Sequence, residues 1–88
     1  MFPVELDGAK VLYYTLQDNY SVIKYQNGEI ADYCHYLAIC HYPDEDAYYL
    51  FCCNKNYEVI FDWLDCSIEG CMKLAASYNE NIIWYQAE

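Results

Sequence analysis

Residues 47–62 read Ala-Tyr-Tyr-Leu-Phe-Cys-Cys-Asn-Lys-Asn-Tyr-Glu-Val-Ile-Phe-Asp, and this run carries the strongest structural signal in the chain. Residues 47–53 are aromatic or apolar throughout, and residues 57–62 are again rich in the types that favour strands. The polar triplet between them, residues 54–56, fits a three-residue turn, because asparagine tolerates the left-handed conformation that such turns use once. The run therefore predicts a β-hairpin at the centre of a small sheet.

The chain before the hairpin supplies further strand-like runs. Residues 35–42 alternate like a strand and end at Pro-Asp-Glu-Asp, because proline cannot continue a central ladder. The predicted centre of the sheet is thus three antiparallel strands in sequence order. Residues 10–16 and 20–26 are expected to pair with each other as a hairpin. Asn27-Gly28 is a strong turn signal, and residues 29–33 are expected to be irregular.

The spacing of apolar residues changes after Asp65. Asp65 or Ser67 can accept a hydrogen bond from a free backbone N–H at the start of a helix. We expect this helix to end near Asn79, and a short edge strand to follow at residues 82–86. The apolar stripe of the helix consists of Ile68, Cys71, Met72, Ala75 and Tyr78.

Together these elements predict a single domain spanning residues 1–88. A chain of 88 residues has room for one hydrophobic core. The predicted class is α+β: a small antiparallel meander of about five to six strands, with one C-terminal amphipathic helix packed on one face. Twelve tyrosines, whose rings pack while their hydroxyl groups seek water, suit a thin sheet with one wet face.

Charge is the most unusual feature of the composition. Fourteen Asp and Glu residues stand against four lysines and no arginine, so the net charge is −10. Affinity for nucleic acid depends largely on basic side chains, and anionic membrane surfaces repel an acidic domain. The composition therefore argues against direct binding to nucleic acid or membrane. Two interpretations stay open: acidity that serves only solubility, and acidity that recognises a basic protein.

Six cysteines would suggest disulfides in a secreted chain of this size. Residues 1–8 lack the basic and apolar regions of a signal peptide, and no apolar run approaches the roughly eighteen residues of a membrane span. We therefore expect a cytoplasmic protein whose thiols are reduced and mostly buried as small hydrophobic groups.

Catalytic motifs are missing or incomplete. The three serines lack the Gly-x-Ser-x-Gly context of a hydrolase, and the three glycines form no phosphate loop. Asp44 and Asp46 resemble the start of a calcium loop, but Tyr49 stands where that loop needs glycine. The sequence thus predicts a protein without enzymatic activity, cofactor or metal.

One constellation keeps a different class open. Cys34-His35 and Cys40-His41 supply thiolate and imidazole, which bind zinc well and from which a cysteine nucleophile can be built. A spacing of six residues along a strand spans roughly 20 Å, so the two pairs can share one ion only if the chain bends. A thiol- or zinc-dependent protein using these four residues is the alternative from another class.

The order of the central motifs resembles a pattern in small uncharacterised bacterial proteins. In that pattern a hairpin ending in Asp leads to a helix starting Ser-Ile-Glu, and residues 49–51, 56–60, Asp62 and 67–69 carry it here. It covers roughly a third of the chain and implies structure rather than function. In size, acidity and tyrosine content the chain also resembles bacterial immunity proteins, which neutralise a toxin's active site.

Acidic and aromatic residues gather at both ends of the predicted hairpin. Antiparallel return brings its entrance and exit to one rim, so the two groups are expected to form a single acidic edge. Aromatic anchors surrounded by charge are typical of tight protein interfaces. The predicted partner-binding residues are Asp44, Glu45, Asp46, Tyr48, Tyr49, Asp62, Trp63, Asp65 and Glu69.

The sequence thus favours an acidic, non-enzymatic inhibitor that binds and occludes a basic protein. The leading hypothesis is an immunity protein that neutralises a bacterial toxin such as a nuclease. A phage-encoded nucleic-acid mimic that inhibits a host defence complex, in the manner of anti-CRISPR proteins, would use the same surface. An exposed aromatic edge strand would also allow a homodimer.

Overall fold

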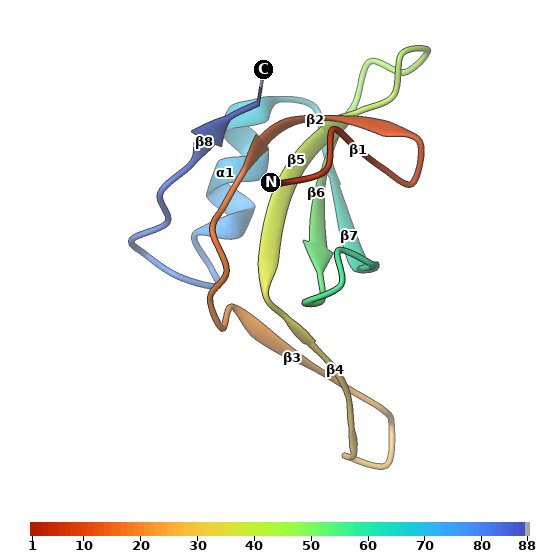
Figure 1. Cartoon of the computed structure of the whole chain (residues 1–88), viewed down its shortest axis with the longest axis vertical. Helices are drawn as coiled ribbons and strands as arrows, with labels where there is room; N and C mark the ends of the chain where they lie inside the picture. The colour runs from red at the N-terminus through yellow and green to blue at the C-terminus, as the bar shows by residue number, and fades with distance from the viewer. Residues whose placement is uncertain (88) are drawn as a thin grey trace.

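The computed structural model describes residues 1–87, which form mainly β-strands (Figure 1). In chain order the elements are β1 (Glu5–Leu6), β2 (Ala9–Tyr14), β3 (Ser21–Lys24), β4 (Ile30–Cys34), β5 (Tyr36–His41), β6 (Tyr48–Cys53), β7 (Val59–Asp65), α1 (Ile68–Ala75) and β8 (Tyr85–Gln86). The larger sheet has the order β1-β2-β5-β6-β7, with β8 also paired to β2, and β3 and β4 form a separate sheet. The expected last strand at residues 82–86 is thus reduced to two residues.

The predicted hairpin is confirmed, but its place at the centre of the sheet is wrong, because its second strand, β7, lies at the edge. That strand also starts and ends later than predicted. β6 and β7 pair antiparallel, with Tyr48 opposite Asp65 and Cys53 opposite Val59. The left-handed residue of the turn is Tyr57, at φ +61°, rather than an asparagine. This conformation is uncommon for a bulky residue, and stacking of the Tyr57 ring on Tyr36, 4.6 Å apart between centroids, offsets its cost.

The predicted pairing near the N-terminus is wrong. β2 pairs with β5, and β3 pairs with β4, which occupies the segment expected to be irregular. The turn between β3 and β4 holds Gly28 at φ +90°, and the Asn27 side chain accepts a hydrogen bond from the N–H of Glu29 at 3.0 Å. This turn gives β3 a local partner, so β2 pairs elsewhere. β3 and β4 project from the rest of the molecule as an arm (Figure 1).

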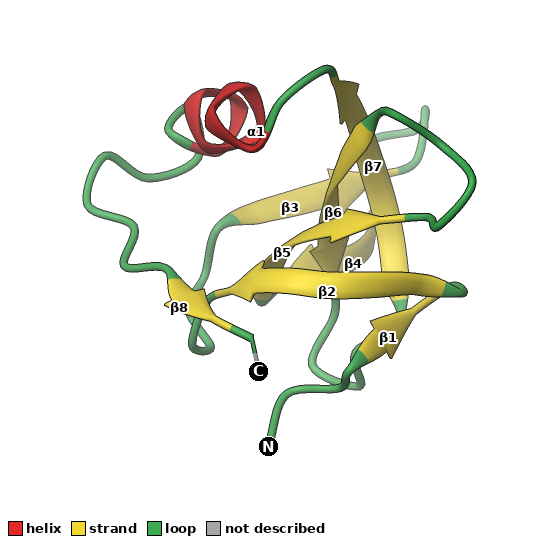
Figure 2. Cartoon of the chain, turned by 90° about the horizontal axis from the view of Figure 1, so that it is seen from above, coloured by secondary structure: helices red, strands yellow, loops and turns green. Residues whose placement is uncertain are grey.

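The predicted α+β class, a meander covered by an amphipathic helix, is also wrong. The chain is mostly β: 44% of the described residues lie in strands, most of them in a curled antiparallel sheet. Figure 2 shows the single short helix beside this curl. α1 has eight residues, of which only Cys71 and Ala75 are buried, and it stops well before Asn79. Ser77 Oγ donates a hydrogen bond to the Leu74 carbonyl at 2.7 Å, a local bond that competes with further helix.

Core side chains cover both faces of β5 and β6, so the expected wet face does not exist there. The face toward α1 carries Leu37, Ile39, Leu50 and Cys52. The opposite face carries Ala38, Cys40, Phe51 and Cys53. The N-terminal segment closes this second face, where the Phe2 ring stacks on Tyr14 at 4.7 Å between centroids. Strands buried on both faces need continuous apolar runs, and β6 has one.

Asn54 holds the β6–β7 turn, and its replacement should cost considerable stability. The side chain is 6% exposed; it accepts hydrogen bonds from the N–H groups of Asn56 and Glu58 and donates to the carboxylates of Asp32 and Glu58. Because each bond contributes about 1 kcal/mol and buried unpaired groups add to the loss, Asn54→Ala should lower the free energy of unfolding by about 2–4 kcal/mol. Urea denaturation measures this loss. Asn56→Ala, at an exposed position of the same turn, is the control, and an equal loss there would contradict the assignment.

Candidate functional site

The β5–β6 turn and the end of β7 lie side by side, as expected for an acidic edge. Residues 44–46 are exposed in that turn, and the pairing of half-buried Tyr48 with Asp65 places the end of β7 beside it. Asp62 lies elsewhere: it stands in mid-strand opposite Phe51, because β7 continues to Asp65. The predicted acidic edge therefore runs from the turn along β7.

Two tyrosines on the face opposite α1 bring together carboxylates from three parts of the chain. The Tyr49 hydroxyl donates a hydrogen bond to Glu45 Oε1 at 2.8 Å, and this bond raises the pKa of Tyr49, with a contribution from Asp62. The Tyr42 hydroxyl donates to the Asp7 carbonyl oxygen at 2.9 Å. Burial, followed by the charge of Asp7, raises the pKa of Tyr42. The two rings meet edge to face, with centroids 5.3 Å apart.

Asp7 is a rim residue that sequence reasoning missed. It occupies the β1–β2 turn at φ +48°, and the pairing of Lys10 with His41 brings this turn next to the end of β5. The turn pair Asp-Gly was visible in the sequence, but its neighbour in space was not. Glu69, by contrast, is exposed in the first turn of α1, where it complements the helix dipole. We refer to Asp7, Asp44, Glu45, Asp46, Asp62 and Asp65 as the acidic rim.

Two of the predicted residues have structural partners on the helix side. Trp63 Nε1 donates a hydrogen bond to the Tyr78 hydroxyl at 2.8 Å. Asp65 Oδ1 accepts a hydrogen bond from the N–H of Ser67 at 3.2 Å. The Asp65 carboxylate also lies against Gly70, and a side chain at position 70 would displace it. Asp65 therefore supports the start of α1 as well as carrying charge.

β7 forms the open edge of the larger sheet. Within residues 1–87 it pairs only with β6, so its outward N–H and C=O groups have no strand partner. Residues 61–64 are all exposed, and the exposed fractions are 43% for Phe61, 42% for Trp63 and 60% for Leu64. Phe61 and Leu64 were not predicted as site residues, because a sequence pattern identifies a strand without its place in the sheet.

The arm formed by β3 and β4 offers a second apolar surface. Its exposed large apolar side chains are Val22, Tyr25, Ile30 and Tyr33. Asn54 Nδ2 donates a hydrogen bond to Asp32 Oδ2 at 3.0 Å, and this bond lowers the pKa of Asp32. It fastens the base of the arm to the β6–β7 turn, at the opposite end of β6 from the acidic rim.

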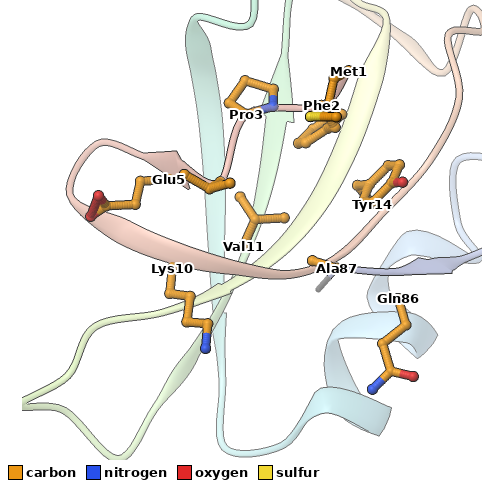
Figure 3. Close-up of a pocket in the computed structure, with 10 residues that line it drawn as sticks. Met1, Phe2, Pro3, Glu5, Lys10, Val11, Tyr14, Gln86 and Ala87 are labelled. Carbon is orange, nitrogen blue, oxygen red and sulfur yellow. The ribbon is translucent and has the colours of Figure 1, made fainter.

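A hollow of about 580 Å³ lies between the N-terminal segment and residues 86–87 (Figure 3). Glu5 and Lys10 stand opposite each other on β1 and β2, where unlike charges stabilise strand pairing. Figure 3 shows both side chains extending away from the Phe2 and Tyr14 rings. The hollow thus presents mainly apolar surface, and its lining residues form no catalytic arrangement.

The cysteines and histidines of the alternative hypothesis do not converge. Within residues 1–87 no group of three or more His, Cys, Asp or Glu side chains is arranged to hold a metal ion. Cys34 and Cys40 are fully buried, and His35 and His41 are half-buried. A hydrogen bond with Cys52 together with burial raises the pKa of Cys34, and burial raises that of Cys40. A thiol nucleophile acts as the thiolate, so these raised pKa values disfavour Cys34 and Cys40 as nucleophiles.

This burial pattern predicts how the six thiols react. Cys66 is exposed and the other five are buried, so a disulfide reagent such as DTNB should label one thiol per native molecule rapidly. The remaining thiols should react only as the molecule unfolds, and labelling in denaturant should reach all six. Cys66→Ser should remove the fast phase alone. A second fast thiol would contradict the burial and favour thiol chemistry.

The carboxylates around Tyr42 and Tyr49 predict a change in tyrosine titration. Glu45→Gln with Asp62→Asn removes negative charge that opposes the phenolate, so the raised pKa of each phenol should fall. In the unmodified protein, the raised pKa values of Tyr42 and Tyr49 should contribute to folding stability below the ordinary tyrosine pKa of about 10. This contribution should be lost as the pH rises through the raised pKa values. NMR titration of labelled tyrosines measures both pKa values. Glu29→Gln, in the turn of the arm, is the control and should leave both values unchanged.

Among residues 1–87 no helix has both the length and the apolar character needed to cross a membrane. Comparisons of the chain with protein-family models, curated proteins and solved structures found no match. The surface features on which a function can be based are the acidic rim, the open edge of β7 and the arm.

Proposed function

We propose that this protein is a non-enzymatic inhibitor that recognises a basic protein through the acidic rim and blocks its functional cleft. One observation carries the proposal: the Tyr49 hydroxyl bonds the Glu45 carboxylate and the Tyr42 hydroxyl bonds the Asp7 backbone, while the charges of Glu45 and Asp62 contribute to the raised pKa of both tyrosines and that of Asp7 to the raised pKa of Tyr42. The fourteen acidic residues outnumber the four lysines by ten, so the chain carries a large excess of negative charge. These charges are available to a partner.

The mechanism is occlusion. Carboxylates of the rim steer the protein toward a positively charged cleft and speed association. The exposed rings that flank Asp62 along β7, Phe61 and Trp63, then supply apolar contact that slows dissociation. Hydrogen bonds from tyrosine hydroxyls and the strand pairing hold the rim in place, so little conformational entropy is lost on binding. The partner's substrate is excluded because the positive charges in the cleft that would bind this substrate are occupied.

An immunity protein that neutralises a bacterial toxin such as a nuclease fits this mechanism. A phage-encoded nucleic-acid mimic fits it as well, because a net charge of −10 equals that of about five base pairs of DNA. Both would present an acidic surface to a cleft built for phosphates. We propose a cytoplasmic location, in which the thiols stay reduced, and no direct binding to nucleic acid or membrane.

Charge reversal tests the rim. A panel of basic nuclease domains serves as the probe, and we expect salt-dependent association and inhibition with at least one member. Changing Asp44, Glu45 and Asp46 to lysine should lower its association rate at low salt by about tenfold or more, because steering is lost. Stopped-flow fluorescence measures the rate.

The matched control changes Asp18, Glu29 and Glu80 to lysine, since these exposed residues carry the same total charge elsewhere. Equal slowing by both triple variants would exclude the rim as the interface. A panel without any bound or inhibited member would refute nuclease occlusion.

A further inference from the structure

We propose that the open edge of β7 takes up a strand from the basic partner, so that recognition includes backbone pairing as well as charge. This inference rests on the proposed function, because it names the partner segment that binds beside the acidic rim. The segment is extended, and basic and apolar residues alternate along it.

β7 has the length and the open side that strand addition needs. It spans seven residues, Val59–Asp65, and β6 occupies one side. No backbone hydrogen bond leaves its other side within residues 1–87. Alternate residues of a paired strand turn their N–H and C=O groups outward, so about three residues of β7 present unpaired groups to solvent. An added strand would satisfy those groups.

The edge has little protection against pairing. Open edges are commonly blocked by lysine, proline, a bulge or short length. β7 contains no lysine or proline, and its bulge lies near Val59, which leaves residues 61–65 regular. Its only charged residues are Asp62 and Asp65. These carboxylates repel acidic strands and attract basic ones.

The side chains of β7 determine which residue types the added strand needs. Residues directly opposite on neighbouring strands face the same side. Phe61 and Trp63 stand opposite Cys52 and Leu50, so both rings lie on the helix side, with centroids 5.2 Å apart. Asp62 lies on the other side. An added strand therefore needs apolar residues beside the two rings and a basic residue between them.

An open hollow of about 530 Å³ at the end of β7 favours a further basic residue. It is lined by Asp46, Ala47, Leu64, Asp65 and Cys66. A lysine or arginine can pack its methylene groups against Leu64 while its charged end meets the two carboxylates. The basic residue at the end of the added strand would lie here.

A second copy of this chain is a poorer occupant. Each copy carries a net charge of −10. Asp62 is the middle residue of β7, so the antiparallel register that pairs the whole strand with its copy places the two Asp62 side chains opposite each other. Like charges directly opposite destabilise strand pairing. The homodimer expected from an aromatic edge is therefore not proposed.

The test uses a capped peptide of seven residues, the length of β7, in which lysine and valine alternate. Amide hydrogen exchange of β7 is followed by NMR with and without peptide. At saturation, alternate amides of residues 61–65 should exchange about tenfold or more slowly, because only outward N–H groups gain partners. Added salt should weaken the binding.

Two variants locate the contact. Leu64→Lys adds a positive charge to the edge and should weaken peptide binding by about tenfold. Ile83→Lys makes the same change at a residue that is 68% exposed, against 60% for Leu64, and should have no effect.

The outcomes separate this inference from the proposed function. Binding without alternate protection of β7, or no peptide binding while a basic nuclease is still inhibited, would overturn strand addition alone. Alternate protection that appears in the concentrated protein without peptide would assign the edge to a second copy. Failure of both the peptide and every basic nuclease to bind would refute the proposed function too.

Discussion

Burial of β5 and β6 on both faces is the constraint on which the rest of the structure depends. A chain of 88 residues can place two strands in its interior only if nearly all their side chains are apolar. The face toward α1 uses branched residues such as Leu37 and Ile39, whereas the opposite face uses small ones such as Ala38 and Cys40. Phe2 of the N-terminal segment packs against that face. Buried cysteine serves here as a compact hydrophobic group.

This interior determines where charge and function can lie. Carboxylates are excluded from the buried strands, so they gather in turns and on the edge strand. The acidic rim stands at the end of β5 and β6, and tyrosine hydroxyls of half-buried rings fasten it to the core. Pairing with β6 holds β7 in place on one side, and its other side is open. A rigid acidic rim beside an open strand is suited to a basic, extended partner.

Predictions succeeded where the cause is local. The β6–β7 hairpin follows from two apolar runs around a polar turn, and Ser67 caps α1 as expected, accepting a hydrogen bond from the N–H of Gly70 at 2.9 Å. The predicted pairing of β2 with β3 is wrong, because alternation of side chains identifies a strand but not the strand it pairs with. The predicted helix length is wrong, because the hydrogen bond from Ser77 to the Leu74 carbonyl competes with continuation of the helix, although the apolar stripe in the sequence continues.

The candidate site likewise has features that follow from local sequence and features that depend on tertiary packing. The acidity of residues 44–46 and the nearness of Asp65 follow from a hairpin, which local chemistry specifies. The place of Asp7 at the rim depends on β2 pairing with β5, a contact between residues about thirty positions apart. The charge balance, the Asn27-Gly28 turn and the helix start were thus determined by the sequence itself. Strand order, the open edge of β7 and the arrangement around Tyr42 and Tyr49 depend on tertiary packing. The alternation pattern of a strand is the same in the middle of a sheet and at its edge, so it does not specify the partner strand. Burial of the second face of β5 and β6 determines which of the possible pairings forms.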